Sequence, residues 1–210
     1  MAAIEPGRLI VLAAPSGAGK TTLVHELLTR EPELQFSVSY TTRPKRETEL
    51  EGEDYFFVSE QEFDARRARD AFLECAEVFD NWYGTSQEYI QSLLDQGRSV
   101  LLEIDWQGAA QVRSRRPDAV CVFIMPPSRD ELERRLRGRR TDSEEVIQRR
   151  LRQALSDMAH WSEFDYVIIN DDLDKAVAEL TDLVSTGSAE NRTSSPETQL
   201  RIEKILALSQ

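Results

Sequence analysis

The stretch RLIVLAAPSGAGKTTLVHELL, residues 8–28, decides the fold predicted for this chain. It begins with an unbroken apolar run, which is typical of a strand buried on both faces of a parallel sheet. A glycine-rich turn follows, and after it Leu23, Val24, Leu27 and Leu28 recur at the spacing of a helix that Glu31-Pro32 then ends. Such a turn at a helix N-terminus binds anions, because it gathers backbone N–H groups and the positive end of the helix dipole. The stretch therefore predicts a phosphate-binding loop.

The loop fits the pattern G-x-x-x-x-G-K-[ST] at Gly19, Lys20 and Thr21, but Ala14 stands at the first place, where glycine is usual. Alanine fits if its φ is negative, because only a positive φ demands glycine. Lys20 is expected to reach the β- and γ-phosphates of a nucleoside triphosphate, and the Thr21 hydroxyl to ligate Mg²⁺. An ordinary glycine turn is the alternative, and the Gly-Lys-Thr sequence after a buried strand disfavours it. The residues expected to bind the nucleotide are Ala14, Pro15, Ser16, Gly17, Ala18, Gly19, Lys20 and Thr21.

Composition is typical of a soluble globular protein, since 40% of the 210 residues are hydrophobic and 30% are charged. The length suits one well-cored domain with inserts. The net charge of −12 argues against a general nucleic-acid binder, although residues 129–152 form a basic run. Cys75 and Cys121 lack metal-ligand spacing and are expected to be reduced thiols of a cytoplasmic protein. We find no pattern of a signal peptide or a membrane span, so a membrane is not an expected partner. Because of the net charge, nucleic acid is not an expected partner either.

Strand patterns alternate with helical patterns along the rest of the chain. Segments 99–108, 119–127 and 165–171 are predicted as buried strands. Residues 128–160 form a charged helical stretch that is interrupted near Gly138. This alternation predicts an α/β fold with a mainly parallel sheet flanked by helices.

Two shorter strands are predicted between the loop and these segments. One begins the stretch 36–46, which then turns polar and basic, and the other lies in DYFFVS at 54–59. Ser59 and Glu62 together predict a capping box at the start of the next helix. Residues 185–198 have the composition of a polar linker, and the residues after it are compatible with a short amphipathic helix.

A second group of polar side chains points to an anionic acceptor. Arg43 and Arg46 stand close together with Tyr55 downstream, and two guanidinium forks with a phenol suit a phosphate monoester. The stretch 72–86 adds a carboxylate, a phenol and a hydroxyl at Glu74, Tyr83 and Thr85. Each has a simpler alternative. Arg43 and Arg46 could form a solvated basic turn, Glu74 could be an exposed helix residue, and Tyr83 could be a core aromatic.

Five stretches, taken in order along the chain, together resemble guanylate kinase. They are APSGAGKTT at 14–22, FSVSYTTRPKRETELEGEDYFFVS at 36–59, FLECAEVFDNWYGTS at 72–86, EIDWQG at 103–108 and IINDD at 168–172. The resemblance runs from about Arg8 to Leu183, and its S-x-T-T-R-x-x-R pattern is highly specific. It implies a P-loop nucleoside monophosphate kinase fold with a GMP-binding insert and a lid. It also implies phosphorylation of GMP, and of dGMP, by MgATP in purine nucleotide metabolism and GMP recycling.

The resemblance implies domain bounds as well. A kinase-like domain would span 7–184, and a polar linker and tail 185–210. Within the domain, the core would comprise 7–36, 99–127 and 161–184, the GMP-binding insert 37–98, and the lid-containing segment 128–160.

Roles follow from the resemblance residue by residue. The GMP phosphate would be held by Arg43, Arg46, Tyr55 and Tyr83, and the guanine read by Ser39, Glu74 and Thr85, with Glu103 and Asp105 near the base or ribose. Asn170 would lie by the adenine of ATP. The catalytic group would comprise Lys20, Arg43 and three lid arginines, Arg135, Arg139 and Arg150. The departures from the family pattern are Ala14 for glycine, Thr21 for serine and Glu103 for the commoner aspartate. Neither His25 nor His160 is expected to be catalytic.

Two other functions compete with this one. Guanylate-kinase-like domains of scaffold proteins bind phosphopeptides and have lost the phosphate loop, but Lys20 and Thr21 are present here. A kinase for another nucleoside monophosphate or a sugar phosphate would share only the core, and Ser39, Glu74 and Thr85 argue against it. The expected partners are therefore ATP and GMP, while the oligomeric state stays open.

Overall fold

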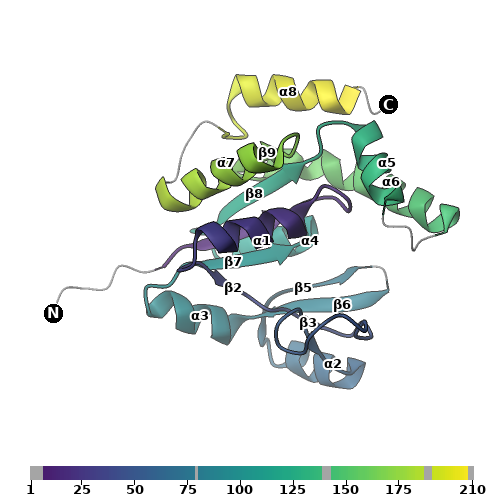
Figure 1. Cartoon of the computed structure of the whole chain (residues 1–210). Helices are drawn as coiled ribbons and strands as arrows, with labels where there is room; N and C mark the ends of the chain where they lie inside the picture. The colour runs from purple at the N-terminus through teal and green to yellow at the C-terminus, as the bar shows by residue number, and fades with distance from the viewer. Residues whose placement is uncertain (1–6, 79, 139–142, 187–190, 208–210) are drawn as a thin grey trace. The chain divides into compact units, whose positions relative to one another are not determined.

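The computed structural model describes residues 7–78, 80–138, 143–186 and 191–207 (Figure 1). Within them the chain divides into two compact units. Unit 1 comprises the described residues of Met1–Ile10, Glu33–Leu102 and Gln107–Ala119, and unit 2 those of Val11–Pro32, Glu103–Trp106 and Val120–Gln210. Each unit has its own fully buried aromatic side chains, among them Phe63 in unit 1 and Phe123 in unit 2.

Strands and helices alternate through most of the chain. The strands are β1 (Leu9–Ala13), β2 (Gln35–Phe36), β3 (Tyr40–Thr41), β4 (Phe56–Phe57), β5 (Phe72–Val78), β6 (Asn81–Ser86), β7 (Val100–Ile104), β8 (Val120–Met125) and β9 (Tyr166–Ile169). The helices are α1 (Lys20–Arg30), α2 (Glu60–Ala68), α3 (Gln87–Asp95), α4 (Trp106–Arg115), α5 (Arg129–Arg137), α6 (Glu144–Met158), the 3₁₀-helix η1 (Ala159–Glu163), α7 (Leu173–Thr186) and α8 (Pro196–Ala207). Every helix among the described residues is too short or too polar to cross a membrane.

The strands form a five-stranded sheet with the order β2-β7-β1-β8-β9 and a four-stranded sheet with the order β4-β3-β6-β5. In the first sheet β2 pairs in parallel with β7, and β8 in parallel with β9. Because helices connect the strands of this sheet along the chain, parallel pairing is the expected result. The predicted α/β fold with a mainly parallel sheet is confirmed.

The unbroken apolar runs of the sequence become the buried strands. All five side chains of β1 are buried, as are the five from Cys121 to Met125 in β8. Helix α1 begins at Lys20, directly after the glycine turn, and ends at Arg30, since Pro32 follows. In unit 2, α1 packs against α7, which also contacts β9.

Unit 1 is built around an antiparallel hairpin of β5 and β6, in which Glu74 lies opposite Thr85. Asp80, at the turn, has a φ of 64°, a left-handed conformation that aspartate adopts more readily than most residues. The sequence did not predict these two strands. Helix α2, which precedes this hairpin, has the N-terminal cap that the sequence predicted: the Ser59 hydroxyl accepts the N–H of Glu62 at 3.2 Å.

The chain after α7 returns to the outer strand β9. Residues 191–193 are joined to residues 165–167 by two backbone hydrogen bonds of 3.0 Å, around an antiparallel bridge between Arg192 and Tyr166. Extended backbone can pair here because β9 has no other strand on this side in the sheet order.

The end of the chain contains the short amphipathic helix that the sequence allowed, but it differs from the polar linker and tail expected over 185–210 in two respects. Helix α7 continues to Thr186, and α8 carries Ile202 and Ile205 as buried side chains. The physical reason is that apolar residues recur at helical spacing in α8, so that one face of the helix is apolar and is buried. The polar composition of the preceding segment hid the backbone pairing, because composition does not report it.

Candidate active site

The loop between β1 and α1, in unit 2, has the conformation that its glycines allow. Gly17 and Gly19 each have a φ of 90°, in the left-handed region that other side chains avoid. Among the described residues, the non-glycine positions with positive φ are Asp70 and Asp80, so Ala14 lies outside that region. Alanine at the first place of the pattern is therefore unstrained.

Both glycines are also required by close approach. A Cβ atom on Gly19 would lie 2.5 Å from Nδ2 of Asn170, and one on Gly17 would lie 3.0 Å from the side chain of Leu136. The loop is thus packed directly against α5 and the residue that follows β9. Its backbone stays close to whatever anion it binds, because no side chain intervenes at these two positions.

The two loop residues expected to act on the phosphates contact the end of β7. Nζ of Lys20 donates to the carbonyl of Ile104 at 2.6 Å. The Thr21 hydroxyl donates to Oε1 of Glu103 at 2.8 Å. Glu103 thus contacts the loop residue expected to ligate Mg²⁺, whereas the sequence placed it near the guanine or ribose of GMP. An acid at the end of a buried strand was the available signal, since P-loop enzymes hold Mg²⁺ with such a carboxylate and the loop hydroxyl.

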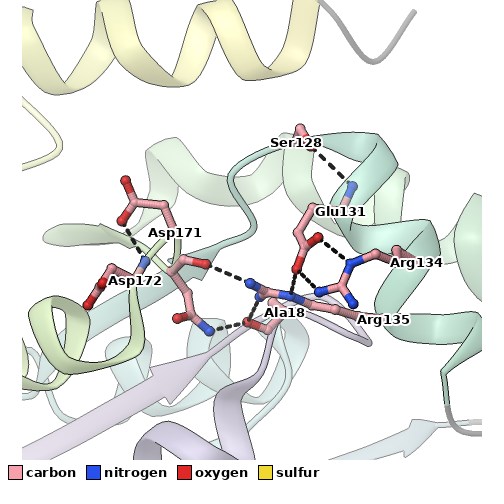
Figure 2. A network of polar contacts seen from close by, with 8 residues as sticks. Ala18, Ser128, Glu131, Arg134, Arg135, Asp171 and Asp172 are labelled. Carbon is pink, nitrogen blue, oxygen red and sulfur yellow. Dashed lines mark hydrogen bonds and ion pairs between the residues drawn. The ribbon is translucent and has the colours of Figure 1, made fainter.

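Arg135, on α5, donates to three groups, and one of them is a backbone carbonyl of the same loop (Figure 2). Its Nε donates to Glu131 at 2.7 Å, its NH1 to the carbonyl of Ala18 at 3.1 Å and its NH2 to the carbonyl of Asn170 at 3.0 Å. The Ala18 carbonyl also accepts Nδ2 of Asn170 at 2.7 Å, and Asn170 is buried. Arg135 therefore braces the phosphate loop, whereas the sequence expected it to close over the transferring phosphate.

Glu131 keeps this arginine oriented. The Ser128 hydroxyl caps α5 by accepting the N–H of Glu131 at 3.1 Å (Figure 2). Hydrogen bonds from Arg134 and Arg135 lower the pKa of Glu131 to about 2. The carboxylate is therefore ionised at neutral pH and binds both guanidinium groups at once.

A hollow of about 330 Å³ opens beside the loop in unit 2. It is lined by Gly17, Gly19, Thr22, Arg135, Asn170 and Leu173. This volume lies within the range of small-molecule sites, and its polar groups are backbone, amide and guanidinium. The hollow includes Asn170, which the sequence placed by the adenine of ATP.

Unit 1 contains a chain of buried polar side chains. The Thr85 hydroxyl donates to Oε1 of Glu74 at 2.6 Å, and the hydroxyls of Ser39 and Thr85 lie 3.5 Å apart. All three side chains are buried, and Glu74 is only 3% exposed. A buried carboxylate is costly unless donors surround it, so this cluster is suited to a ligand that supplies N–H groups. The three residues expected to read guanine are thus brought together.

The residues expected to hold the GMP phosphate also gather in unit 1. The guanidinium of Arg43 lies 5.4 Å from the ring centre of Tyr55, whose ring lies 5.8 Å from that of Tyr83. Arg43 is gripped by Glu49, a residue that the sequence analysis missed, through bonds of 2.7 and 3.1 Å. The hydrogen bonds that Arg43 donates to Glu49 raise the pKa of Arg43. Arg46 joins the group through the same carboxylate, at 3.7 Å.

A family model described as guanylate kinase matches residues 6–187 of the chain. This chain belongs to the guanylate kinase family. A guanylate kinase of Alkalilimnicola ehrlichii is 54% identical over 175 residues, which are 83% of this chain and 86% of that protein. One of Escherichia coli strain K12 is 52% identical over 206 residues, which are 96% and 98% of the two chains. The crystal structure of guanylate kinase from Anaplasma phagocytophilum superposes with a TM-score of 0.73 and 31% identity, and covers 95% of both chains.

As a member of the guanylate kinase family, the chain has the P-loop nucleoside monophosphate kinase fold. In the segment that the sequence predicted to contain the lid, Arg137 of α5 pairs with Glu144 of α6. Arg150 lies on α6 and is half-buried. Arg139, the remaining lid arginine predicted for this guanylate kinase, lies outside the described residues.

Asp105 and the two histidines are the remaining residues that the sequence analysis named. Asp105 is half-buried and directly follows β7. His25 is exposed on α1, and the ring of His160 stacks on Trp106 with centroids 3.5 Å apart. Neither histidine contacts a residue of the two phosphate sites in the bonds described here. Of the two cysteines, Cys121 is buried and Cys75 half-buried, and both are thiols.

Proposed function

We propose that this chain transfers the γ-phosphate of ATP to GMP, giving ADP and GDP, with dGMP as a further acceptor. The observation that carries the proposal is the buried cluster of Ser39, Glu74 and Thr85. Guanine presents N1–H and the 2-amino group side by side, and a carboxylate accepts both. Adenine has an acceptor at N1 and no 2-amino group, so it would offer the buried carboxylate no N–H donor on that edge and would place a lone pair against it. Such a reaction would serve purine nucleotide metabolism in the cytoplasm.

The donor side of the reaction belongs to the phosphate loop. The backbone N–H groups of residues 16–19 and the α1 dipole bind the phosphates of ATP, and Lys20 neutralises charge on the β- and γ-groups. Its ammonium donates to the carbonyl of Ile104, a neutral acceptor, and phosphate oxygens are charged acceptors that bind an ammonium more strongly. Arg135 keeps the loop in shape through the Ala18 carbonyl.

Mg²⁺ fits the residues beside the loop. Thr21 and Glu103 offer a hydroxyl and a carboxylate in direct contact, and hard oxygen ligands are what Mg²⁺ requires. Among the described residues no cluster of three or more His, Cys, Asp or Glu side chains is suited to a metal, so phosphate oxygens and water would complete the shell. When bound, the ion would neutralise charge on the donor phosphates. We therefore assign Glu103 to the donor side.

The acceptor side must hold an anion that attacks another anion. The phosphate of GMP is already ionised, so no protein base is needed, and positioning with charge neutralisation supplies the rate. Arg43 and Arg46 provide two positive charges, and the phenols of Tyr55 and Tyr83 provide hydrogen-bond donors. Arg150 and Arg139 are proposed to add positive charge from the lid.

A coupled assay that compares GMP, dGMP, AMP, UMP and dTMP as acceptors tests the proposal. We expect turnover with GMP and dGMP and at least about 10⁴-fold lower kcat/KM with AMP, because a buried polar site rejects a base that leaves it unpaired. Lys20→Ala should abolish transfer while calorimetry finds GMP affinity retained, since the GMP contacts lie in unit 1. Equal turnover of AMP would remove Glu74 as the base reader. Binding of GMP without any turnover by the unmodified chain would instead support a binding module.

A further inference from the structure

Glu49 holds the guanidinium of Arg43 by two hydrogen bonds. Oε1 of Glu49 accepts NH2 at 2.7 Å, and Oε2 accepts NH1 at 3.1 Å. The two side chains are 12% and 15% exposed, so water competes little for this pair. NH1 also donates to the carbonyl of Pro44 at 2.8 Å. A two-point contact of this kind fixes the plane of a guanidinium as well as its position.

Glu49 is itself held by a turn that does not involve the Arg43 side chain. Its N–H donates to the carbonyl of Arg46 at 3.2 Å, and its Oε2 accepts the N–H of Arg46 at 2.8 Å. The hydrogen bonds from Arg43 hold the pKa of Glu49 below its ordinary value, so the carboxylate is ionised at neutral pH. Glu49 is thus an anchored anion inside a group of side chains suited to bind an anion.

The bonds to Glu49 and Pro44 leave one edge of the Arg43 guanidinium for another partner. A guanidinium carries five N–H donors, and these bonds use three of them. The other two, on Nε and NH2, project in parallel from a single edge, which matches two oxygens of a phosphate group. The same guanidinium lies 5.4 Å from the ring centre of Tyr55, which belongs to the group proposed to hold the GMP phosphate.

We propose that Glu49 is a positioning residue for the acceptor phosphate: it fixes Arg43 so that the remaining N–H edge receives the phosphate of GMP. The inference rests on the proposed function, because it takes GMP as the acceptor. Glu49 does not touch the substrate and stays bound to Arg43 when GMP arrives.

The opposite arrangement is a placeholder, a carboxylate that occupies the phosphate's place and leaves when GMP binds. Two arguments favour the proposed arrangement, in which Glu49 stays bound to Arg43 as a brace. Glu49 is tied to the backbone of Arg46 in both directions, so leaving would break the turn as well as the ion pair. Two arginines and one carboxylate also keep a net charge of +1, which still attracts a phosphate dianion.

Glu49→Ala, with Glu47→Ala as the matched control, separates these arrangements. Glu47 lies in the same segment, is exposed, and its loss changes the net charge equally. For Glu49→Ala we expect the KM and Kd for GMP to rise about 10- to 100-fold, because one charge-assisted contact is misplaced. The kcat at saturating GMP and the KM for ATP should change little. Glu49→Asp should recover part of the loss, and Glu47→Ala should match the unmodified chain.

Guanosine, which lacks the phosphate, reports whether the effect is local. Its affinity, measured by displacement titration, should be the same in the unmodified chain and in Glu49→Ala. Tighter GMP binding by Glu49→Ala would overturn the brace in favour of the placeholder. Unchanged GMP binding, or equal loss of guanosine and GMP binding, would overturn it as well. A chain that binds GMP but never phosphorylates it would refute the proposed function, whereas the Glu49 effect on GMP affinity would still be measured.

Discussion

Gly19→Ala tests how tightly the phosphate loop is constrained. The φ of 90° at Gly19 costs an L-residue about 1–2 kcal/mol. The new Cβ would also meet Nδ2 of Asn170 at 2.5 Å, so this buried side chain must leave the Ala18 carbonyl, to which it donates at 2.7 Å. The carbonyl keeps its bond from Arg135, but the buried amide loses its acceptor, at a cost of about 1–3 kcal/mol.

The two costs together predict a loss of about 2–5 kcal/mol in the free energy of unfolding. Urea unfolding measures it, and calorimetry with a non-hydrolysable ATP analogue measures the accompanying loss of affinity. Gly138→Ala is the control, because Gly138 has a φ of −64° and a Cβ there would lie 3.4 Å or more from its neighbours. The control should be neutral or gain up to about 1 kcal/mol. If Gly19→Ala unfolds at the same urea concentration as Gly138→Ala and binds the analogue normally, the strain argument is refuted.

Three further substitutions test other parts of the structure. Glu74→Gln turns an N–H toward the N1–H of guanine and should lower kcat/KM for GMP about 10²-fold with the fold retained; a variant of normal efficiency that still excludes AMP would remove Glu74 from base reading. Ile202→Ala, in a fully buried position of α8, should lower the free energy of unfolding by about 2–5 kcal/mol, and no change in urea unfolding would mean that α8 is undocked. Glu131→Gln should destabilise the chain at neutral pH. Because folding depresses the pKa of Glu131 from 4.5 to about 2, its contribution is complete above pH 4.5 and lost as the pH falls toward 2. The difference in stability between the two chains should shrink across that range, and a constant difference would contradict the ion pair.

Local patterns predicted the elements that depend on local chemistry. The run LIVLA became β1, the helix after the loop stopped before Pro32, and Ser59 capped α2. Each of these outcomes is determined by burial, backbone geometry or a hydrogen bond within a few residues along the chain. The loop pattern predicted Lys20 and Thr21, and the resemblance to guanylate kinase added roles that no periodicity could supply, such as base reading by Glu74 and Thr85.

Contacts between residues far apart in the sequence could not be predicted from such local patterns. Thr21 meets Glu103 across 82 positions, and Arg135 meets the Ala18 carbonyl across 117, so only the folded chain brings them together. Glu49 is close in sequence to Arg43, yet in a segment rich in acids nothing marked it among Glu47, Glu51 and Glu53. Its burial distinguishes it, and burial is a property of the tertiary structure.

The segment 191–193, which pairs with β9, has a consequence for the behaviour of many copies of the chain. An outer strand presents a row of backbone donors and acceptors, which another chain can extend into an intermolecular sheet. The bonds from the Val167 N–H to Asn191 and from the Thr193 N–H to Asp165 occupy that row. A chain cut before Asn191 would keep every residue proposed for transfer but would expose a template for aggregation. We therefore expect the shortened chain to aggregate more readily at high concentration, a property that catalytic assays of a dilute enzyme do not measure.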